Sequence, residues 1–181
     1  MRNSYQVISA DCHIDMTWMP GDLWASSAPA RWKNLAPQVR QTEDGPRWYV
    51  EDKEVGVFGG LGFTFRPVNR GESVHMDKMF ETGFYEGGPH PTTPELRIRD
   101  QDLDGVDAEV IYGILGIGSH FQSAELTGWV YQIYNDWAVE FCKARPGRFL
   151  CLASLPNHDP EAAAKELRRA ANSGLKGAEL D

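Results

Sequence analysis

Val7-Ile8-Ser9-Ala10-Asp11-Cys12-His13 is a short, mostly apolar stretch that ends in an acid and a histidine. Residues 7–11 are typical of a strand buried on both faces of a parallel sheet, because β-branched residues come first and small ones follow. Asp11 and His13 are two residues apart, so their side chains leave the chain on the same side. A carboxylate oxygen and an imidazole nitrogen placed together form half of a divalent-metal shell. On spacing alone a second interpretation stays open, in which Asp11 caps the next turn and His13 is an ordinary loop residue.

The composition limits the classes of function and partner. The chain has 181 residues, 41% of them hydrophobic, and a net charge of -8 with a pI near 5.1. This acidic balance argues against nucleic acid or an anionic membrane surface as the main partner and favours a small-molecule substrate. No apolar stretch approaches the roughly 20 residues of a membrane helix, and no signal-like segment precedes the first strand, so we expect a cytoplasmic protein.

The three cysteines are widely spaced and form no C-x-x-C motif, so the sequence indicates neither a disulfide framework nor a zinc ribbon. Cys142 and Cys151 are expected in the core. Cys12 lies beside the proposed metal ligands and is expected to be sensitive to oxidation.

The segment after the first strand contains many aromatic residues. Residues 17–37 predict a loop and then a short helix capped by Asp22. Trp18 and Trp24 are candidates to wall a substrate pocket, with ordinary core packing as the alternative. Residues 47–50 and 55–58 predict a β-hairpin with a four-residue turn at 51–54. We interpret residues at about 41–91 as an insertion over the active site, because long structured loops in compact domains are usually functional.

The rest of the chain alternates regularly between helix and strand. Caps and apolar spacing predict helices at 94–104, 124–144 and 160–173, and strands at 108–112, 149–155 and 175–180. This rhythm is typical of a parallel α/β protein, and the first strand lacks the G-x-G-x-x-G turn of a doubly wound fold. We therefore predict a (β/α)8 TIM-type barrel with about its first four β/α units present. His120 and His158 follow the second and third of these strands, on the face of Asp11 and His13, and are candidates for substrate binding; His158 has solvent exposure as its alternative.

Several motifs resemble one family. The stretch at residues 7–15, followed by Pro20-Gly21-Asp22-Leu23-Trp24, is similar to the opening of the metal-dependent amidohydrolase-related family that includes aminocarboxymuconate-semialdehyde decarboxylases and aromatic-acid decarboxylases. Residues 102–110, 134–137, 146–149 and 152–156 resemble its later elements in order and spacing. The resemblance implies a distorted barrel with one divalent metal, zinc or alternatively manganese. Asp11 and His13 match the first two ligands, whereas the later histidine and aspartate have no counterpart in residues 1–181.

The resemblance implies a metal-dependent hydrolase or decarboxylase that acts on a small aromatic or cyclic carboxylate or lactone. It identifies no catalytic residue. The alternative is a non-catalytic half-barrel, active or stable only through assembly with another chain. Because an open parallel sheet exposes its edges, we expect a homo-oligomer. The aromatic side chains at 48, 58, 63 and 65 suit either an apolar substrate or a subunit contact.

Overall fold

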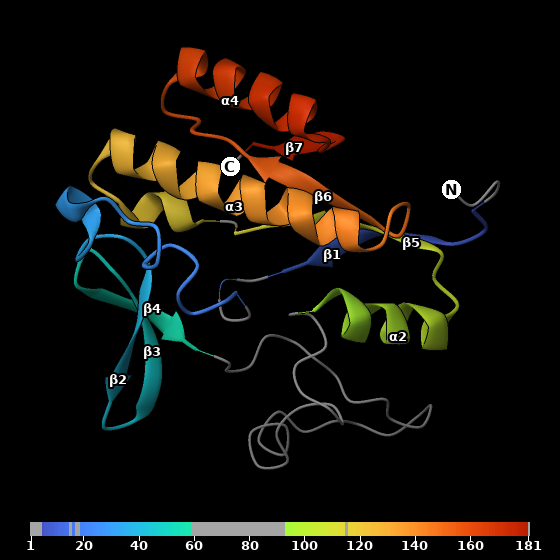
Figure 1. Cartoon of the computed structure of the whole chain (residues 1–181), viewed down its shortest axis with the longest axis horizontal. Helices are drawn as coiled ribbons and strands as arrows, with labels where there is room; N and C mark the ends of the chain where they lie inside the picture. The colour runs from blue at the N-terminus through green and yellow to red at the C-terminus, as the bar shows by residue number, and fades with distance from the viewer. Residues whose placement is uncertain (1–4, 15, 17–18, 59–92, 115, 181) are drawn as a thin grey trace.

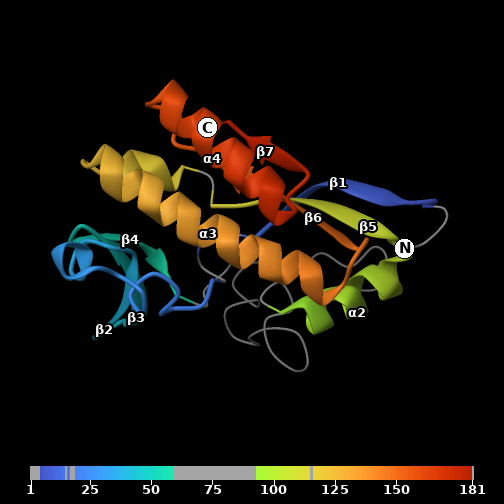
Figure 2. The same ribbon diagram turned by 45° about the horizontal axis from the view of Figure 1, so that its top comes forward.

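The structure, a computed structural model, describes residues 5–14, 16, 19–58, 93–114 and 116–180. These residues form a four-stranded parallel sheet and a three-stranded antiparallel sheet. The long helix α3 (Ala124–Ala144) adjoins both of them (Figures 1 and 2). Within the described part of the chain, no helix has the length and apolar character needed to cross a membrane.

The parallel sheet contains the four strands of the predicted alternating pattern. They are β1 (Ile8–His13), β5 (Ala108–Tyr112), β6 (Phe149–Ser154) and β7 (Gly177–Glu179), and they neighbour one another in this order. All three pairings are parallel, so the carboxyl ends of the four strands lie at the same end of the sheet. Strands that follow in sequence and lie side by side match the start of the predicted barrel, and the parallel α/β class is thereby confirmed.

Each connecting helix begins and ends where its capping residues predict. Helix α2 (Pro94–Asp104) begins after Thr93, whose hydroxyl accepts from the Leu96 N–H, and ends at Gly105 with a positive φ of 72°. Helix α4 (Pro160–Ser173) begins after Asp159, whose carboxylate accepts from the next two free N–H groups. Helices α3 and α4 lie side by side over the parallel sheet (Figure 1).

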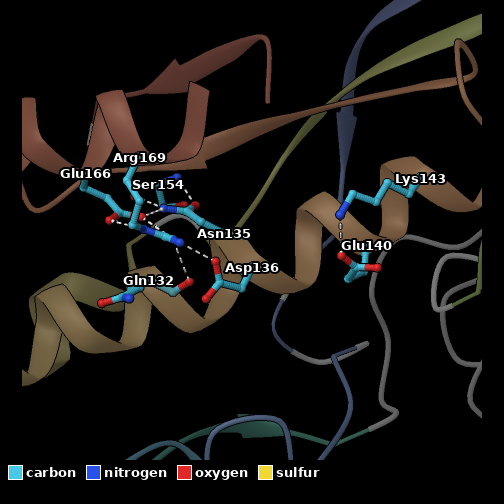
Figure 3. Close-up of polar contacts among 8 residues, drawn as sticks. All are labelled: Gln132, Asn135, Asp136, Glu140, Lys143, Ser154, Glu166 and Arg169. Atoms are coloured by element: carbon cyan, nitrogen blue, oxygen red, sulfur yellow. Dashed lines mark hydrogen bonds and ion pairs between the residues drawn. The ribbon is translucent and has the colours of Figure 1, made fainter. Parts of the chain in front are cut away.

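A buried polar cluster ties α3 to β6 and α4. Asn135 is fully buried, and its amide donates to the Ser154 carbonyl at 3.0 Å and accepts from the Ser154 N–H at 2.9 Å. The same amide donates to the Glu166 carboxylate at 2.7 Å, and Glu166 in turn pairs with Arg169 (Figure 3). Because every member of this group has a partner, burial of these polar atoms fixes one arrangement of the three elements.

The antiparallel sheet is larger than the predicted hairpin. It consists of β2 (Gln38–Thr42), β3 (Gly45–Val50) and β4 (Lys53–Val57), in that order. The turn between β3 and β4 contains only Glu51 and Asp52, both with positive φ, so the predicted four-residue turn is wrong. Two residues with positive φ give a turn whose twist matches that of the strands, which explains its tightness.

Two other expectations about the first third of the chain are wrong. Residues 17–37 contain no α-helix in their described part, but turns and the short 3-10 helix η2 (Ala30–Trp32). Within the described residues the predicted strand at 7–11 is not buried on both faces, since Val7 and Ile8 are 48% and 52% exposed. It lies at the edge of the described sheet, with β5 as its neighbour. Of the expected insertion at about 41–91, residues 59–91 lie outside the described residues.

Candidate metal centre at the end of the first strand

Asp11 and His13 meet at the carboxyl end of β1. The His13 Nε2 atom lies 3.2 Å from Asp11 Oδ1, and both side chains face solvent, with 40% and 88% of their surface exposed. The pairing of β1 with β5 shifts its register between Ser9 and Cys12, so the strand is irregular just where Asp11 occurs. Such irregularities often reorient a side chain beside an active site. The sequence spacing therefore correctly predicts that the two groups converge.

The imidazole of His13 is held in place by the neighbouring strand. His13 is paired in register with Tyr112, and their rings stack with centroids 5.5 Å apart and planes inclined by 26°. Directly after it, the Ile14 N–H donates to the Tyr112 carbonyl at 3.0 Å. This packing limits rotation of the ring, so a donor nitrogen remains available next to the carboxylate of Asp11.

Arg97, which was not among the predicted site residues, contacts the backbone of His13. Its guanidinium pairs with the Glu109 carboxylate and donates to the His13 carbonyl at 3.2 Å. The two charged side chains are only 9% and 12% exposed. An acid in the middle of the apolar strand Ala108–Tyr112 was the available signal, because a buried carboxylate needs a cationic partner.

A second buried acid, Glu179, lies at the carboxyl ends of the neighbouring strands. Its carboxylate accepts from the Ser154 hydroxyl and from the Gly113 N–H, the latter at 3.2 Å. Glu179 is 7% exposed, and its bonds link the carboxyl ends of β5, β6 and β7. The signal was again an acid in a predicted buried strand, at residues 175–180.

The candidate substrate-binding residues are only partly located. His120 ends the short 3-10 helix η4 (Ile117–His120), and His158 lies in the turn before α4; both are exposed. Within the described residues, no hydrogen bond or ion pair joins either histidine to Asp11 or His13. Trp18 lies outside the described residues, so all three assignments remain predictions.

Trp24, the other tryptophan considered for a pocket, has a structural role instead. Trp24 is fully buried, and its indole N–H donates to the Val130 carbonyl of α3 at 3.0 Å. It packs edge-on against Trp48, which is 1% exposed and also contacts the ring of Phe58. Core packing, the alternative for Trp24, is confirmed. Residues 63 and 65 lie outside the described residues.

The donors at this end of β1 suit a divalent cation. One carboxylate oxygen and one imidazole nitrogen converge there, a mixed set that zinc and manganese both accept. In the described ranges, no group of three His, Cys, Asp or Glu side chains is arranged to hold a metal ion. Asp11 and His13 therefore fit as two members of a ligand set, and their role as ligands remains a prediction.

Comparison with known proteins places this geometry in a family. A family model described as Amidohydrolase matches residues 10–181. Gamma-resorcylate decarboxylase from Rhizobium radiobacter is 51% identical over 45 residues, which are 24% of this chain and 14% of that protein.

Solved structures share the fold at low sequence identity. An amidohydrolase from Mycobacterium avium subsp. paratuberculosis K-10 has a TM-score of 0.65 and 16% identity, over 94% of this chain and 48% of its own. A dihydroxybenzoic acid decarboxylase from Polaromonas sp. JS666, with bound manganese and the inhibitor 2-nitroresorcinol, has a TM-score of 0.50 and 17% identity, over 97% of this chain and 38% of its own. This chain thus spans less than half the length of these relatives. The family match over residues 10–181 shows that the chain belongs to the amidohydrolase family.

Proposed function

We propose that the protein is a metal-dependent carboxy-lyase that removes carbon dioxide from a small hydroxylated aromatic carboxylate. The observation that carries the proposal is the approach of His13 Nε2 to Asp11 Oδ1, at 3.2 Å, at the carboxyl-terminal end of a parallel sheet. In barrel enzymes the active site lies at this end of the strands. We propose further that β1, β5, β6 and β7 are the first four strands of a closed barrel, which their order in the sheet supports.

The residues of this chain have distinct tasks in that reaction. Asp11 and His13 supply an oxygen and a nitrogen ligand, and Tyr112 stacks against the imidazole and fixes its plane. Arg97 positions the backbone of His13 through its carbonyl. A bound divalent ion supplies Lewis-acid polarisation of a substrate oxygen.

Decarboxylation of an aromatic acid has more support than hydrolysis of a lactone. The gamma-resorcylate decarboxylase is 51% identical to part of this chain, although that segment is 45 residues long. The structural neighbour with bound manganese and 2-nitroresorcinol is also a decarboxylase, which makes manganese a candidate beside zinc.

The direct test is an activity assay of the full-length protein after removal of metal and reloading with Mn²⁺ or Zn²⁺. We expect release of carbon dioxide from 2,6-dihydroxybenzoate only after reloading, and a loss of at least about 100-fold in the Asp11→Ala and His13→Ala variants. Thr42→Val, on the distant antiparallel sheet, is the control and should keep full activity. Hydrolysis of a small lactone without carbon dioxide release would contradict the proposal.

We also propose that the chain self-associates. The apolar side chains of Val7 and Ile8 are about half exposed, and β5 is the neighbour of β1 in the described sheet. In residues 1–181 taken alone, an exposed strand edge of this kind favours pairing with another copy. Size-exclusion chromatography with light scattering of residues 1–181 should show an oligomer that weakens in an Ile8→Lys variant, and a monodisperse monomer would contradict the proposal.

A further inference from the structure

A cavity lies at the end of the parallel sheet opposite to Asp11 and His13. Its volume is about 430 Å³, and it opens between the last turn of α3, the start of β6 and the end of α4. Its walls include the apolar side chains of Val139, Phe149, Leu150 and Leu175. A cavity of this size is suited to a small apolar molecule.

Two cysteine side chains line this cavity and contact each other. The Cys151 N–H donates to Cys142 Sγ at 3.4 Å, and both side chains line the cavity. Cys142 is half-buried, whereas Cys151 is only 1% exposed. The pair therefore presents one accessible sulfur to the cavity, and the backbone N–H of the second cysteine is hydrogen-bonded to it.

The surroundings of Cys142 favour its thiolate. The adjacent Cys151 thiol and, to a smaller extent, the Cys151 backbone N–H lower the pKa of Cys142 to about 7, although burial acts in the opposite direction. The pKa of Cys151 is raised by its hydrogen bond to Cys142 and by burial. A thiolate is the nucleophilic form of cysteine, so this environment favours Cys142 over Cys151 as the reactive thiol.

Other charged and titratable groups surround the pair. Lys143 and Lys176 line the cavity together with Tyr5, and Lys143 is paired with Glu140 at 2.7 Å. Behind the sheet, the electrostatic surroundings of Cys151 include the Arg97 and Glu109 pair. Tyr134 is a further neighbour of both cysteines, and burial raises its pKa well above the ordinary value. The positive charge of Lys143 is thus balanced by its pairing with Glu140.

We propose that Cys142 is a modification site for small apolar electrophiles of the α,β-unsaturated carbonyl class, which bind in this cavity. In the step, the Cys142 sulfur forms a C–S bond to the β-carbon of the electrophile. The π electrons of the C=C bond move toward the carbonyl, and the α-carbon takes a proton from water. Nothing is oxidised and no group leaves, so no further reactant is needed.

Cys12 is an internal comparison in the same chain. It is also half-buried, and its thiol contacts the Ser9 hydroxyl at 3.0 Å, but it does not line this cavity. A reagent that selects on access alone would label both residues, whereas selection by this cavity and its donors favours Cys142.

The test is labelling of the full chain at pH 7 with limiting N-ethylmaleimide, followed by peptide mass mapping over time. We expect Cys142 to react at least about tenfold faster than Cys12, and the fast phase to disappear in Cys142→Ser. Cys12→Ser is the matched control and should keep it. Equal rates for Cys12 and Cys142, or faster labelling of Cys12, would overturn the proposal.

Two further measurements distinguish binding in the cavity from reaction of a merely exposed thiol. A maleimide carried on a long polyethylene glycol chain should label Cys142 several-fold more slowly than N-ethylmaleimide, and equal rates would show an open surface thiol. In Cys151→Ala the pH at half-maximal rate should rise from near 7 toward the usual range of a cysteine. An unchanged pH profile would overturn the assignment of Cys151 as the donor. Circular dichroism of each variant verifies that it is folded.

Discussion

Strands β1 and β6 both begin with a large apolar residue but have very different surroundings. Strand β6 lies between β5 and β7 under α3, with Cys151 only 1% exposed. β1 has β5 as its neighbour in the described sheet, and Ile8 is 52% exposed. Within the described residues, β6 is thus part of the packed core, whereas the end of β1 presents polar side chains to solvent.

The largest loss of stability is expected at the buried pair of Arg97 and Glu109, because Glu109 lies on β5, between β1 and β6. Arg97→Met leaves the Glu109 carboxylate buried without a cation and also removes the hydrogen bond to the His13 carbonyl. We expect a loss of about 3 to 5 kcal/mol in the free energy of unfolding, measured by urea denaturation. The double variant Arg97→Met/Glu109→Leu should recover much of this loss, and a double variant as unstable as the single one would argue against a charge effect.

A somewhat smaller loss of stability is expected where α3 contacts β6. Asn135→Ala removes both hydrogen bonds to the Ser154 backbone and the one to Glu166. Because these partners are buried, we expect a loss of about 2 to 3 kcal/mol in the same measurement. Gln132→Ala is the matched control on α3. The Gln132 side chain is exposed, and only its backbone carbonyl, which the substitution keeps, accepts a hydrogen bond from Arg169. It should change stability by less than about 0.5 kcal/mol, and equal losses in the two variants would contradict a specific role for Asn135.

The same comparison explains what the sequence could predict. The helices α2, α3 and α4 depend on local signals such as the caps at Thr93 and Asp159, so their positions were predicted closely. The approach of Asp11 to His13 follows from the two-residue period of a strand, which is also local. The acids Glu109 and Glu179 were visible in the sequence as charges within predicted strands, but their partners were not, because those partners are distant in sequence. The exposure of β1 was missed for the same reason, since burial depends on which strands lie beside it.

Loss of the Asp159 cap of α4 should reduce stability still less, because the cap satisfies only N–H groups at the helix end, near the surface. Asp159→Ala removes the acceptor for the N–H groups of Glu161 and Ala162, which lie 2.9 and 3.1 Å away. We expect a loss of about 1 kcal/mol in thermal or urea unfolding. Asp159→Asn keeps an acceptor oxygen and should lose less. A loss as large as that of Asn135→Ala would show that α4 contributes more to stability than its packing indicates.

The smallest effect on stability is expected at Asp11 and His13 themselves. Their side chains are 88% and 40% exposed, and an ion pair at that exposure contributes little. The metal-free Asp11→Ala and His13→Ala variants should therefore unfold within about 0.5 kcal/mol of the unchanged chain. Bound manganese or zinc in the full-length protein, measured by mass spectrometry of the metal, should nevertheless fall sharply. If either substitution destabilised the metal-free fold by more than 2 kcal/mol, the end of β1 would be part of the scaffold, and loss of metal could no longer be attributed to a lost ligand. Unchanged metal content would instead remove both residues from the ligand set while leaving the rest of the fold intact, so the two measurements together separate a metal site from a structural contact.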